Sequence, residues 1–390
     1  MPQAARSYEH SAAFDSGFLS VGSIHKIHYE QYGTEDGKPG ALPSVSHHVR
    51  LRLILIVVFV HGGPGGSTSF KNTIFFNPSV YRVILFDQRG CGQSLPLGET
   101  RENTLQHLVS DIEALRNHFG IQRWHVFGSS WGTTVSLLYT QTHPEAVISL
   151  ILRGVSFFEA KEKIDFNAAF ERTALFYPEM YDELVGLLTE EERNDIAGSY
   201  AKRFSCGDRA VELAAMKVYD KWGTVVSKLV PKQDESDAPM SEEDEKSTIA
   251  SNRVEWHYHA HDLWLKESRY LEHERLEGLK NIPCAIVNGR YDLICPPIAA
   301  WKLHKLLPKS RLYMIPDAGH SAYVGSRLMW YIDSHTNSNC RSRVRRISLS
   351  IFVMSLQRLQ HSRWLSFQAL HFTTSLAVFR RYDAFPCSCY

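Results

Sequence analysis

The segment Gly128-Ser129-Ser130-Trp131-Gly132 has the spacing G-x-S-x-G. It follows an apolar stretch typical of a strand and opens a stretch with helical periodicity. In a tight strand-to-helix turn of this kind, the central serine projects above the sheet at a helix N-terminus. Developing negative charge is stabilised at that position. We therefore predict that Ser130 is a nucleophile.

A serine hydroxyl is a weak nucleophile and needs a base that is oriented by an acid. After this type of turn the partners follow in the chain order acid, then histidine. Asp292 follows the apolar stretch CAIVNG, and His320 follows RLYMI, so both come at the carboxyl ends of predicted strands. We predict that His320 is the base and that Asp292 orients it, with Asp317 as the alternative acid.

Acyl transfer also needs two fixed N–H donors for the oxyanion. One donor is predicted to be the backbone N–H of Trp131, because this residue follows the nucleophile. The second is expected from the loop HGGPGG (61–66), with Gly63 as the prediction and Gly62 as the alternative. The loop lacks the Lys-Ser/Thr pair of a phosphate-binding P-loop.

Strands alternate with helices on both sides of a long helical stretch. This rhythm predicts an α/β fold with a mostly parallel sheet and right-handed crossovers. From Phe157 to Leu276 helical spacing dominates, which predicts an insertion, and its acidic segment 231–247 is expected to be a solvated loop. The predicted strands are an edge hairpin within 14–32, then 53–60, 81–86, 124–128, 147–153, 284–289 and 311–315; the predicted helices are 104–119, 131–143 and 299–307.

Composition excludes several classes of protein. The 390 residues are 44% hydrophobic and carry a formal net charge of +1, so no global basic field is available to bind nucleic acid or an anionic membrane. The apolar run 51–60 is too short to span a bilayer. Seven cysteines without a C-x-x-C pair favour free thiols and a cytoplasmic location. No metal-ligand spacing is evident, no cofactor is expected, and the sequence predicts no oligomeric state.

Together, HGGPGG, DQRGCGQS, GSSWGTTVSLLYTQTHPE, LRGV, RVEWHY and GRYDLICPP…DAGHSA resemble the proline iminopeptidase family of α/β-hydrolases. The resemblance runs from about Phe14 to Tyr323. It implies an α/β-hydrolase core (14–154 and 281–330) with a helical cap (155–280). It also implies a serine aminopeptidase that releases N-terminal proline from small peptides through an acyl-enzyme, without a metal. Its nucleophile, acid and base fall on Ser130, Asp292 and His320.

The resemblance also implies a substrate site. Glu255 matches a glutamate that binds the free amino end of the substrate, and Cys295 matches a position beside the proline pocket. Aromatic residues that could pack on the proline ring are Phe157, Trp222 and Tyr258, together with Trp131. Two positions depart from the family pattern, because Gly223 replaces a second glutamate and His259 replaces a phenylalanine.

Two longer segments lie outside the family pattern. Residues 42–56 are an atypical insertion, and after Tyr323 the family's final helix is replaced by an atypical basic tail (331–390). From His335 onward the tail carries eight arginines and one acid. We interpret one or both segments as retained introns or a reading-frame error, with a disordered or membrane-contacting tail as the alternative. Loss of the final helix would leave the sheet near His320 uncovered.

Two other functions remain open from sequence. A different serine esterase or amidase of the same fold would use the same three side chains. A non-catalytic, fold-damaged or binding-only product is the alternative from another class. Epoxide hydrolases and dehalogenases are disfavoured, because they carry aspartate where this chain has Ser130.

Overall fold

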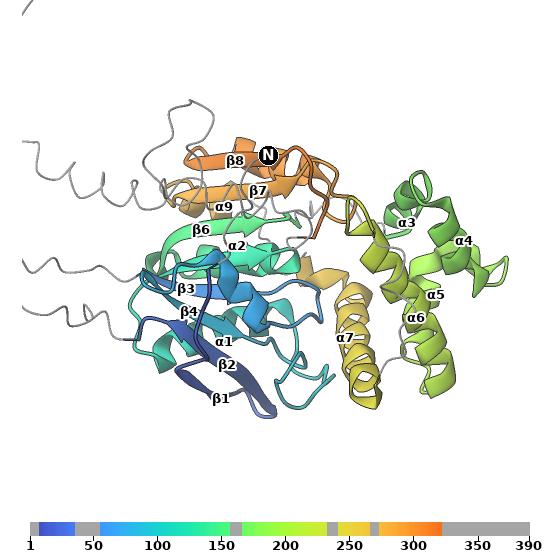
Figure 1. Ribbon diagram of the computed structural model, residues 1–390, viewed down its shortest axis with the longest axis horizontal. Coiled ribbons are helices and arrows are strands. Elements are labelled where there is room, and N and C mark those ends of the chain that lie inside the picture. The colour runs from blue at the N-terminus through green and yellow to red at the C-terminus, as the bar shows by residue number, and fades with distance from the viewer. Residues whose placement is uncertain (1–7, 36–54, 157–165, 232–240, 266–272, 322–390) are drawn as a thin grey trace, which may run out of the picture. The chain divides into compact units, whose positions relative to one another are not determined.

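The computed structural model describes residues 8–35, 55–156, 166–231, 241–265 and 273–321. Its eight strands form one sheet in the order β1-β2-β4-β3-β5-β6-β7-β8, which can be followed in Figure 1. The β1/β2 and β2/β4 pairs are antiparallel, and all other neighbours are parallel. The strands are β1 (Asp15–Val21), β2 (His25–Gly33), β3 (Leu55–Val60), β4 (Tyr81–Phe86), β5 (Trp124–Ser129), β6 (Val147–Arg153), β7 (Cys284–Gly289) and β8 (Ser310–Ile315).

The predicted edge hairpin is confirmed as β1 and β2. The apolar runs LIVVFV and YRVILF are confirmed as the central strands β3 and β4, and their side chains are almost entirely buried. Near-continuous apolar character is expected of parallel strands that are covered on both faces. Residues 42–54, which include most of the predicted insertion, lie outside the described residues.

The order of the strands brings two loops together. The chain passes from β3 to β4 on one side, and then to β5 on the other side of β3. Loops at the carboxyl ends of β3 and β5 therefore open on the same edge of the sheet, where the direction of winding reverses. In open α/β sheets this switch point is the usual place for a ligand.

The helices of the α/β part are α1 (Leu105–His118), α2 (Trp131–Thr142) and α10 (Pro297–Leu306). Thr104 caps α1, since its side chain accepts from the backbone N–H of His107. Leu105, Leu108, Ile112 and Leu115 are all buried on one face of α1, as the periodicity predicted. They belong to one hydrophobic core with α2 and the sheet.

The predicted helical insertion is confirmed between β6 and β7. Its helices are α3 (Phe166–Ala174), α4 (Pro178–Gly186), α5 (Ile196–Arg203), α6 (Arg209–Val226), α7 (Glu242–Ala260) and α9 (His273–Leu279), and its described residues contain no strand. The insertion has a hydrophobic cluster of its own that includes Tyr200, Trp222 and Trp256. Within the described ranges, every helix is too short or too polar to cross a bilayer.

The prediction of a loop over 231–247 is wrong for its last part, because α7 begins at Glu242. Ser241 caps this helix in a capping box with Asp244. The acids at 242–245 occupy the first turn, where the positive end of the helix dipole stabilises them. This run of acids therefore marks the start of a helix as well as a solvated surface. Residues 232–240 and the tail lie outside the described residues.

Candidate active site

Ser130 lies between β5 and α2 with φ 55° and ψ −125°, a strained conformation for a residue with a side chain. The flanking glycines permit the tight turn. A Cβ on Gly132 would lie 2.1 Å from the carbonyl oxygen of Val60, and one on Gly128 would lie 2.5 Å from that of Gly132. The local sequence therefore allows α2 to approach β3 closely, with Ser130 at the turn.

The structure brings Ser130, Asp292 and His320 together. His320 Nε2 lies 3.1 Å from Ser130 Oγ, and His320 Nδ1 lies 2.9 Å from Asp292 Oδ2. Asp292 is 3% exposed as a residue, and its Oδ1 also accepts the backbone N–H groups of Ile294 and Cys295. These contacts hold the carboxylate in place, so that it can fix the orientation of the imidazole.

The space for this arrangement depends on Gly154 at the end of β6. Its φ is +60°, and a Cβ there would lie 3.2 Å from His320 Cε1 and 3.7 Å from Asp292 Oδ2. Of the two acids considered from sequence, the one in contact with Nδ1 is Asp292. Asp317 lies in the turn after β8, before His320.

The loop 61–66 lies directly beside the serine. A Cβ on Gly62 would lie 2.9 Å from Ser130 Cβ. His61 turns the loop, because its Nδ1 lies 2.8 Å from the Gly62 carbonyl and its Nε2 accepts the backbone N–H of Gln88. Burial lowers the pKa of His61, which keeps the ring neutral for both roles. Trp131 is in the first turn of α2, where backbone N–H groups have no acceptor within the helix.

Asp87 is a positioning residue that the sequence reasoning missed. Its Oδ1 accepts the backbone N–H and the hydroxyl of Thr68, at 2.7 and 2.8 Å, and its Oδ2 accepts from Gln93 N–H. Asp87 therefore connects the loop after β4 to the residues that follow the glycine loop. An acid directly after an apolar strand was the signal that could have identified it.

Glu255 lies on α7 next to the same loop. A Cβ on Gly65 would lie 2.2 Å from the Ser251 carbonyl oxygen and 3.2 Å from the backbone nitrogen of Glu255, so α7 contacts the glycine loop directly. Tyr219 of α6 donates its hydroxyl to Glu255 Oε1 at 2.9 Å, and His259 Nε2 lies 3.6 Å from the same oxygen. Burial and the neighbouring carboxylate raise the pKa of Tyr219, so the phenol keeps its proton and donates.

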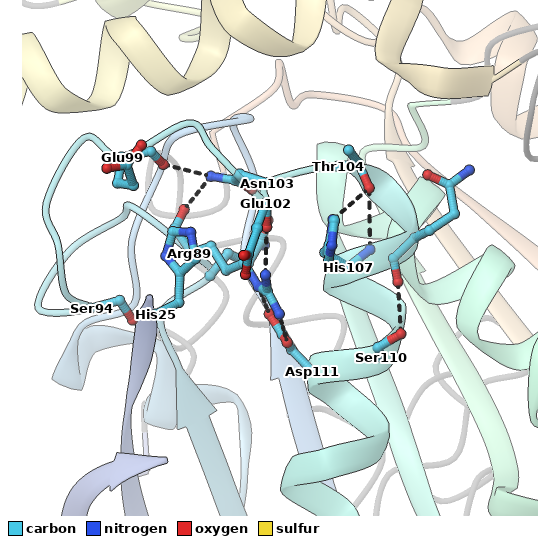
Figure 2. Close-up of polar contacts among 12 residues, drawn as sticks. His25, Arg89, Ser94, Glu99, Glu102, Asn103, Thr104, His107, Ser110 and Asp111 are labelled. Atoms are coloured by element: carbon cyan, nitrogen blue, oxygen red, sulfur yellow. Dashed lines mark hydrogen bonds and ion pairs between the residues drawn. The ribbon is translucent and has the colours of Figure 1, made fainter. Parts of the chain in front are cut away.

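A buried asparagine connects α7 to the α/β part. Asn103 donates from Nδ2 to the carbonyl oxygens of Arg89 and Glu99, as Figure 2 shows. Its Oδ1 accepts the Tyr258 hydroxyl at 2.8 Å, and its carbonyl oxygen lies 3.0 Å from His257 Nε2. Two consecutive residues of α7 therefore bind one residue of the loop before α1.

An ion pair between Arg89 and Asp111 of α1 also holds this loop in place. Arg89 donates from Nε and Nη2 to the two carboxylate oxygens of Asp111, at 2.6 and 2.7 Å, and from Nη1 to the Glu102 carbonyl (Figure 2). Both members of the pair are buried, and a bidentate geometry of this kind restricts orientation. The pair therefore fixes the loop to which α7 is attached.

The described aromatic residues of the predicted substrate site are packed. Trp131 and Tyr258 are each 1% exposed and meet edge to face at 5.2 Å. Trp222 is 6% exposed, lies against Phe170 and donates its indole N–H to Thr173. Their contact with a substrate stays a prediction, and Phe157 lies outside the described residues.

Cys295 lies beside Ser130. Its Sγ lies 4.0 Å from Ser130 Oγ, and its backbone N–H donates to Asp292. Burial raises the pKa of the Cys295 thiol, which therefore stays protonated and behaves as a small apolar group. It narrows the space on one side of the serine.

Comparisons of sequence and of structure identify the fold. Residues 56–326 match the family described as alpha/beta hydrolase fold. With a TM-score of 0.50, the chain is similar in fold to the epoxide hydrolase of Vigna radiata, at 17% identity over 81% of this chain and 96% of the other. The bromoperoxidase of Bacillus anthracis also gives a TM-score of 0.50, at 19% identity over 78% of this chain and 93% of the other. The class defined by fold and site is that of the α/β-hydrolases.

Two curated relatives are more similar in sequence. The chain is 38% identical to the proline iminopeptidase of Arabidopsis thaliana over 310 residues, which are 79% of this chain and 76% of the relative. It is also 38% identical to the proline iminopeptidase of Xylella fastidiosa (strain Temecula1) over 316 residues, or 81% of this chain and 94% of the relative. The chain therefore belongs to the proline iminopeptidase family.

Proposed function

We propose that the protein is a serine aminopeptidase that releases proline from the N-terminus of small peptides. The observation that carries the proposal is the connected set Asp292, His320 and Ser130, with His320 Nε2 3.1 Å from the hydroxyl. Membership of the proline iminopeptidase family supports the choice of substrate. The half-buried carboxylate of Glu255, next to the glycine loop, supports recognition of a free amino end.

In the first half-reaction His320 Nε2 takes the proton of Ser130 Oγ as this oxygen attacks the prolyl carbonyl carbon. The carbonyl oxygen becomes an oxyanion, which the Trp131 N–H and an N–H of the glycine loop, Gly63 or Gly62, would stabilise. Collapse of the tetrahedral intermediate breaks the C–N bond, and His320 returns the proton to the leaving amine. The product is a prolyl ester of Ser130.

In the second half-reaction water attacks this ester, with His320 again taking the proton and then returning it to Ser130 Oγ. Asp292 keeps Nδ1–H directed toward its carboxylate, which stabilises the imidazolium that forms twice in each cycle. Glu255 would bind the protonated amino group of proline by a charge-assisted hydrogen bond. That contact requires a free N-terminus, so it would exclude internal prolines.

A panel of prolyl, alanyl, leucyl and N-acetylprolyl arylamides tests the proposal. The wild type should hydrolyse the prolyl compound preferentially and leave the N-acetylated compound intact. S130A should lose at least about 10³-fold in kcat, and a fluorophosphonate probe should label the wild type at Ser130. The matched control is S129A, which removes the adjacent serine hydroxyl and should keep most of the activity. Prolyl arylamide turnover that survives in S130A would refute Ser130 as the nucleophile.

E255Q tests the binding of the amino group separately from the chemistry. The amide keeps the size of the side chain and removes its charge. KM for prolyl arylamide should rise about tenfold or more, because charge-assisted hydrogen bonds are roughly twice as strong as neutral ones. Labelling of Ser130 by the probe should stay near the wild-type rate. An unchanged KM in E255Q would remove Glu255 from the substrate site. If the wild type hydrolyses esters but no arylamide, the result would favour an esterase.

A further inference from the structure

Gln88 lies shortly after β4 and is buried between the glycine loop and α2. Its backbone N–H donates to His61 Nε2, and its side-chain Nε2 donates to the His61 carbonyl, both at 3.0 Å. Its Oε1 accepts the indole N–H of Trp131 at 3.3 Å. Gln88, His61 and Trp131 are each at most 2% exposed. One amide side chain therefore connects the residue that begins the glycine loop to the first residue of α2.

The backbone of Gln88 is held on both sides. On one side, Asp87 accepts from the backbone N–H and the hydroxyl of Thr68. On the other side, Arg89 forms the buried ion pair with Asp111. Since both neighbours are anchored separately, the Gln88 side chain starts from a fixed point. It can therefore set the separation of the two elements that it contacts.

The contacts of His61 also determine the direction of a predicted oxyanion donor. Because Nε2 accepts from Gln88, the ring proton is on Nδ1, which donates to the Gly62 carbonyl at 2.8 Å. The Gly62–Gly63 peptide is trans, and in a trans peptide the N–H points away from the preceding carbonyl. The Gly63 N–H is therefore directed away from the imidazole. The backbone at this point lies beside the serine, since a Cβ on Gly62 would be 3.6 Å from Ser130 Oγ.

We propose that Gln88 is a positioning residue for the oxyanion site. Its amide keeps the glycine loop and the first turn of α2 at a fixed separation, and its contact with the His61 ring fixes the direction of the Gly63 N–H. This inference rests on the proposed function and deepens it, because the N–H groups of Gly63 and Trp131 are proposed donors to the oxyanion. Stabilisation of that charge depends on donors that are in place before the reaction. Gln88 acts through these two donors and transfers no proton.

Q88L tests this role, because leucine has nearly the same size and removes both side-chain hydrogen bonds. The kcat for prolyl arylamide should fall about 10–10²-fold, since a displacement of about 1 Å at the reacting groups can cost that much. KM should change less than about threefold. The matched control is Q31L on β2, which also removes a buried glutamine with two side-chain partners and should keep kcat within about twofold.

Two inhibitors separate the positioning of the donors from general damage to the site. With pyrrolidine-2-boronic acid, Ser130 Oγ adds to boron and its proton passes to His320, which gives a tetrahedral adduct with a boron-bound oxygen in the oxyanion site. The inhibition constant of this compound should rise in Q88L by about the same factor as kcat/KM falls. L-Prolinol cannot form the adduct, and its inhibition constant should stay within about twofold. An unchanged kcat or an unchanged constant for the boronic acid would overturn the proposal, and so would an equal rise of both inhibition constants.

A second variant keeps the proposal testable where Q88L fails to fold. In Q88E the ionised carboxylate can still accept from Trp131 but cannot donate to the His61 carbonyl, whereas the protonated carboxyl can do both. The kcat of Q88E relative to that of the wild type should therefore be low at pH 8 and rise as the pH falls. A ratio that does not change with pH would contradict the proposal.

Failure of the proposed function would give a different result. The wild type would then not hydrolyse prolyl arylamide, but a fluorophosphonate would still label Ser130 and place a phosphoryl oxygen in the same oxyanion site. Labelling of Q88L should still be about tenfold slower or more than labelling of the wild type. Equal labelling rates in the two proteins would overturn the role of Gln88, whatever the substrate is.

Discussion

Replacement of Asn103 by alanine should loosen the attachment of α7 and leave the catalytic chemistry intact. The side chain makes three hydrogen bonds, two from Nδ2 to carbonyl oxygens and one from the Tyr258 hydroxyl to Oδ1, and the residue is 1% exposed. Alanine leaves two buried groups, the Arg89 carbonyl and the Tyr258 hydroxyl, and one partly buried group, the Glu99 carbonyl, without these partners. Each buried group costs about 1–3 kcal/mol, so N103A should lower the free energy of unfolding by about 2–6 kcal/mol.

Tyr258→Phe breaks one of these bonds from the other side and should cost about 1–2 kcal/mol. Because Asn103 and Tyr258 contact each other directly, the double variant should cost less than the sum of the two single variants. We expect a coupling of about 1 kcal/mol, measured by urea unfolding followed through tryptophan fluorescence. The control is S110A on α1, where the lost bond lies within one exposed turn and the change should stay within about 0.5 kcal/mol.

Two kinetic measurements separate an effect on the position of α7 from an effect on the reactivity of Ser130. KM for prolyl arylamide should rise in N103A, because Glu255 is on the helix that Asn103 binds. The rate at which a fluorophosphonate labels Ser130 should change less than about threefold, since Asp292 and His320 come from the loops after β7 and β8. Additive unfolding energies, or a labelling rate that falls in parallel with the rise in KM, would refute the reasoning.

Three further predictions concern titratable groups. Burial, reinforced by the charge of Glu255, raises the pKa of Asp220 to about 6 against 3.8 for an ordinary carboxyl, so Asp220 lowers stability progressively as pH rises from about 4 to 6. D220N should therefore raise the free energy of unfolding above pH 6, by at most about 3 kcal/mol. The prediction is contradicted if D220N is no more stable than the wild type at pH 8 when the two are compared with their difference at pH 4. Burial, reinforced by Arg123, lowers the pKa of His125 to about 3, so this ring is neutral in the fold and takes up a proton on unfolding below about pH 6.5. The wild type should lose about 2 kcal/mol between pH 6.5 and pH 5 from this group, and H125N should show a correspondingly shallower slope in urea titrations. D292N should keep the fold and lower kcat by roughly 10³–10⁴, because an amide no longer fixes the imidazole; a loss below about tenfold would remove Asp292 from the mechanism.

The elements that present the site could be predicted because their signals are local. Ser130 lies in a strand–turn–helix whose glycines are part of the same five residues, and the turn depends on close contacts that any side chain would block. The helix ends could be predicted for the same reason, since Thr104 caps its own helix. One local signal was misinterpreted, because the acids after Ser241 were taken for a loop although they form the first turn of α7.

Contacts between distant parts of the chain were decided by tertiary packing. Sequence left Asp292 and Asp317 as alternatives, and the turn that follows β7 brings the first of them to His320 Nδ1. Nothing in the local pattern pairs Asn103 with Tyr258, which are 155 residues apart in the chain. Such pairs depend on the register of strands and on how two helices pack.

The sequence by itself determined the turn that presents Ser130, the glycine loop and the alternation of strands and helices, because each is encoded by neighbouring residues. The surroundings of Glu255 required the fold. Tyr219 and Asp220 carry no motif, and they reach α7 because α6 packs on it. Whether a carboxylate has a cationic partner is a property of three-dimensional proximity, which periodicity along one chain does not encode.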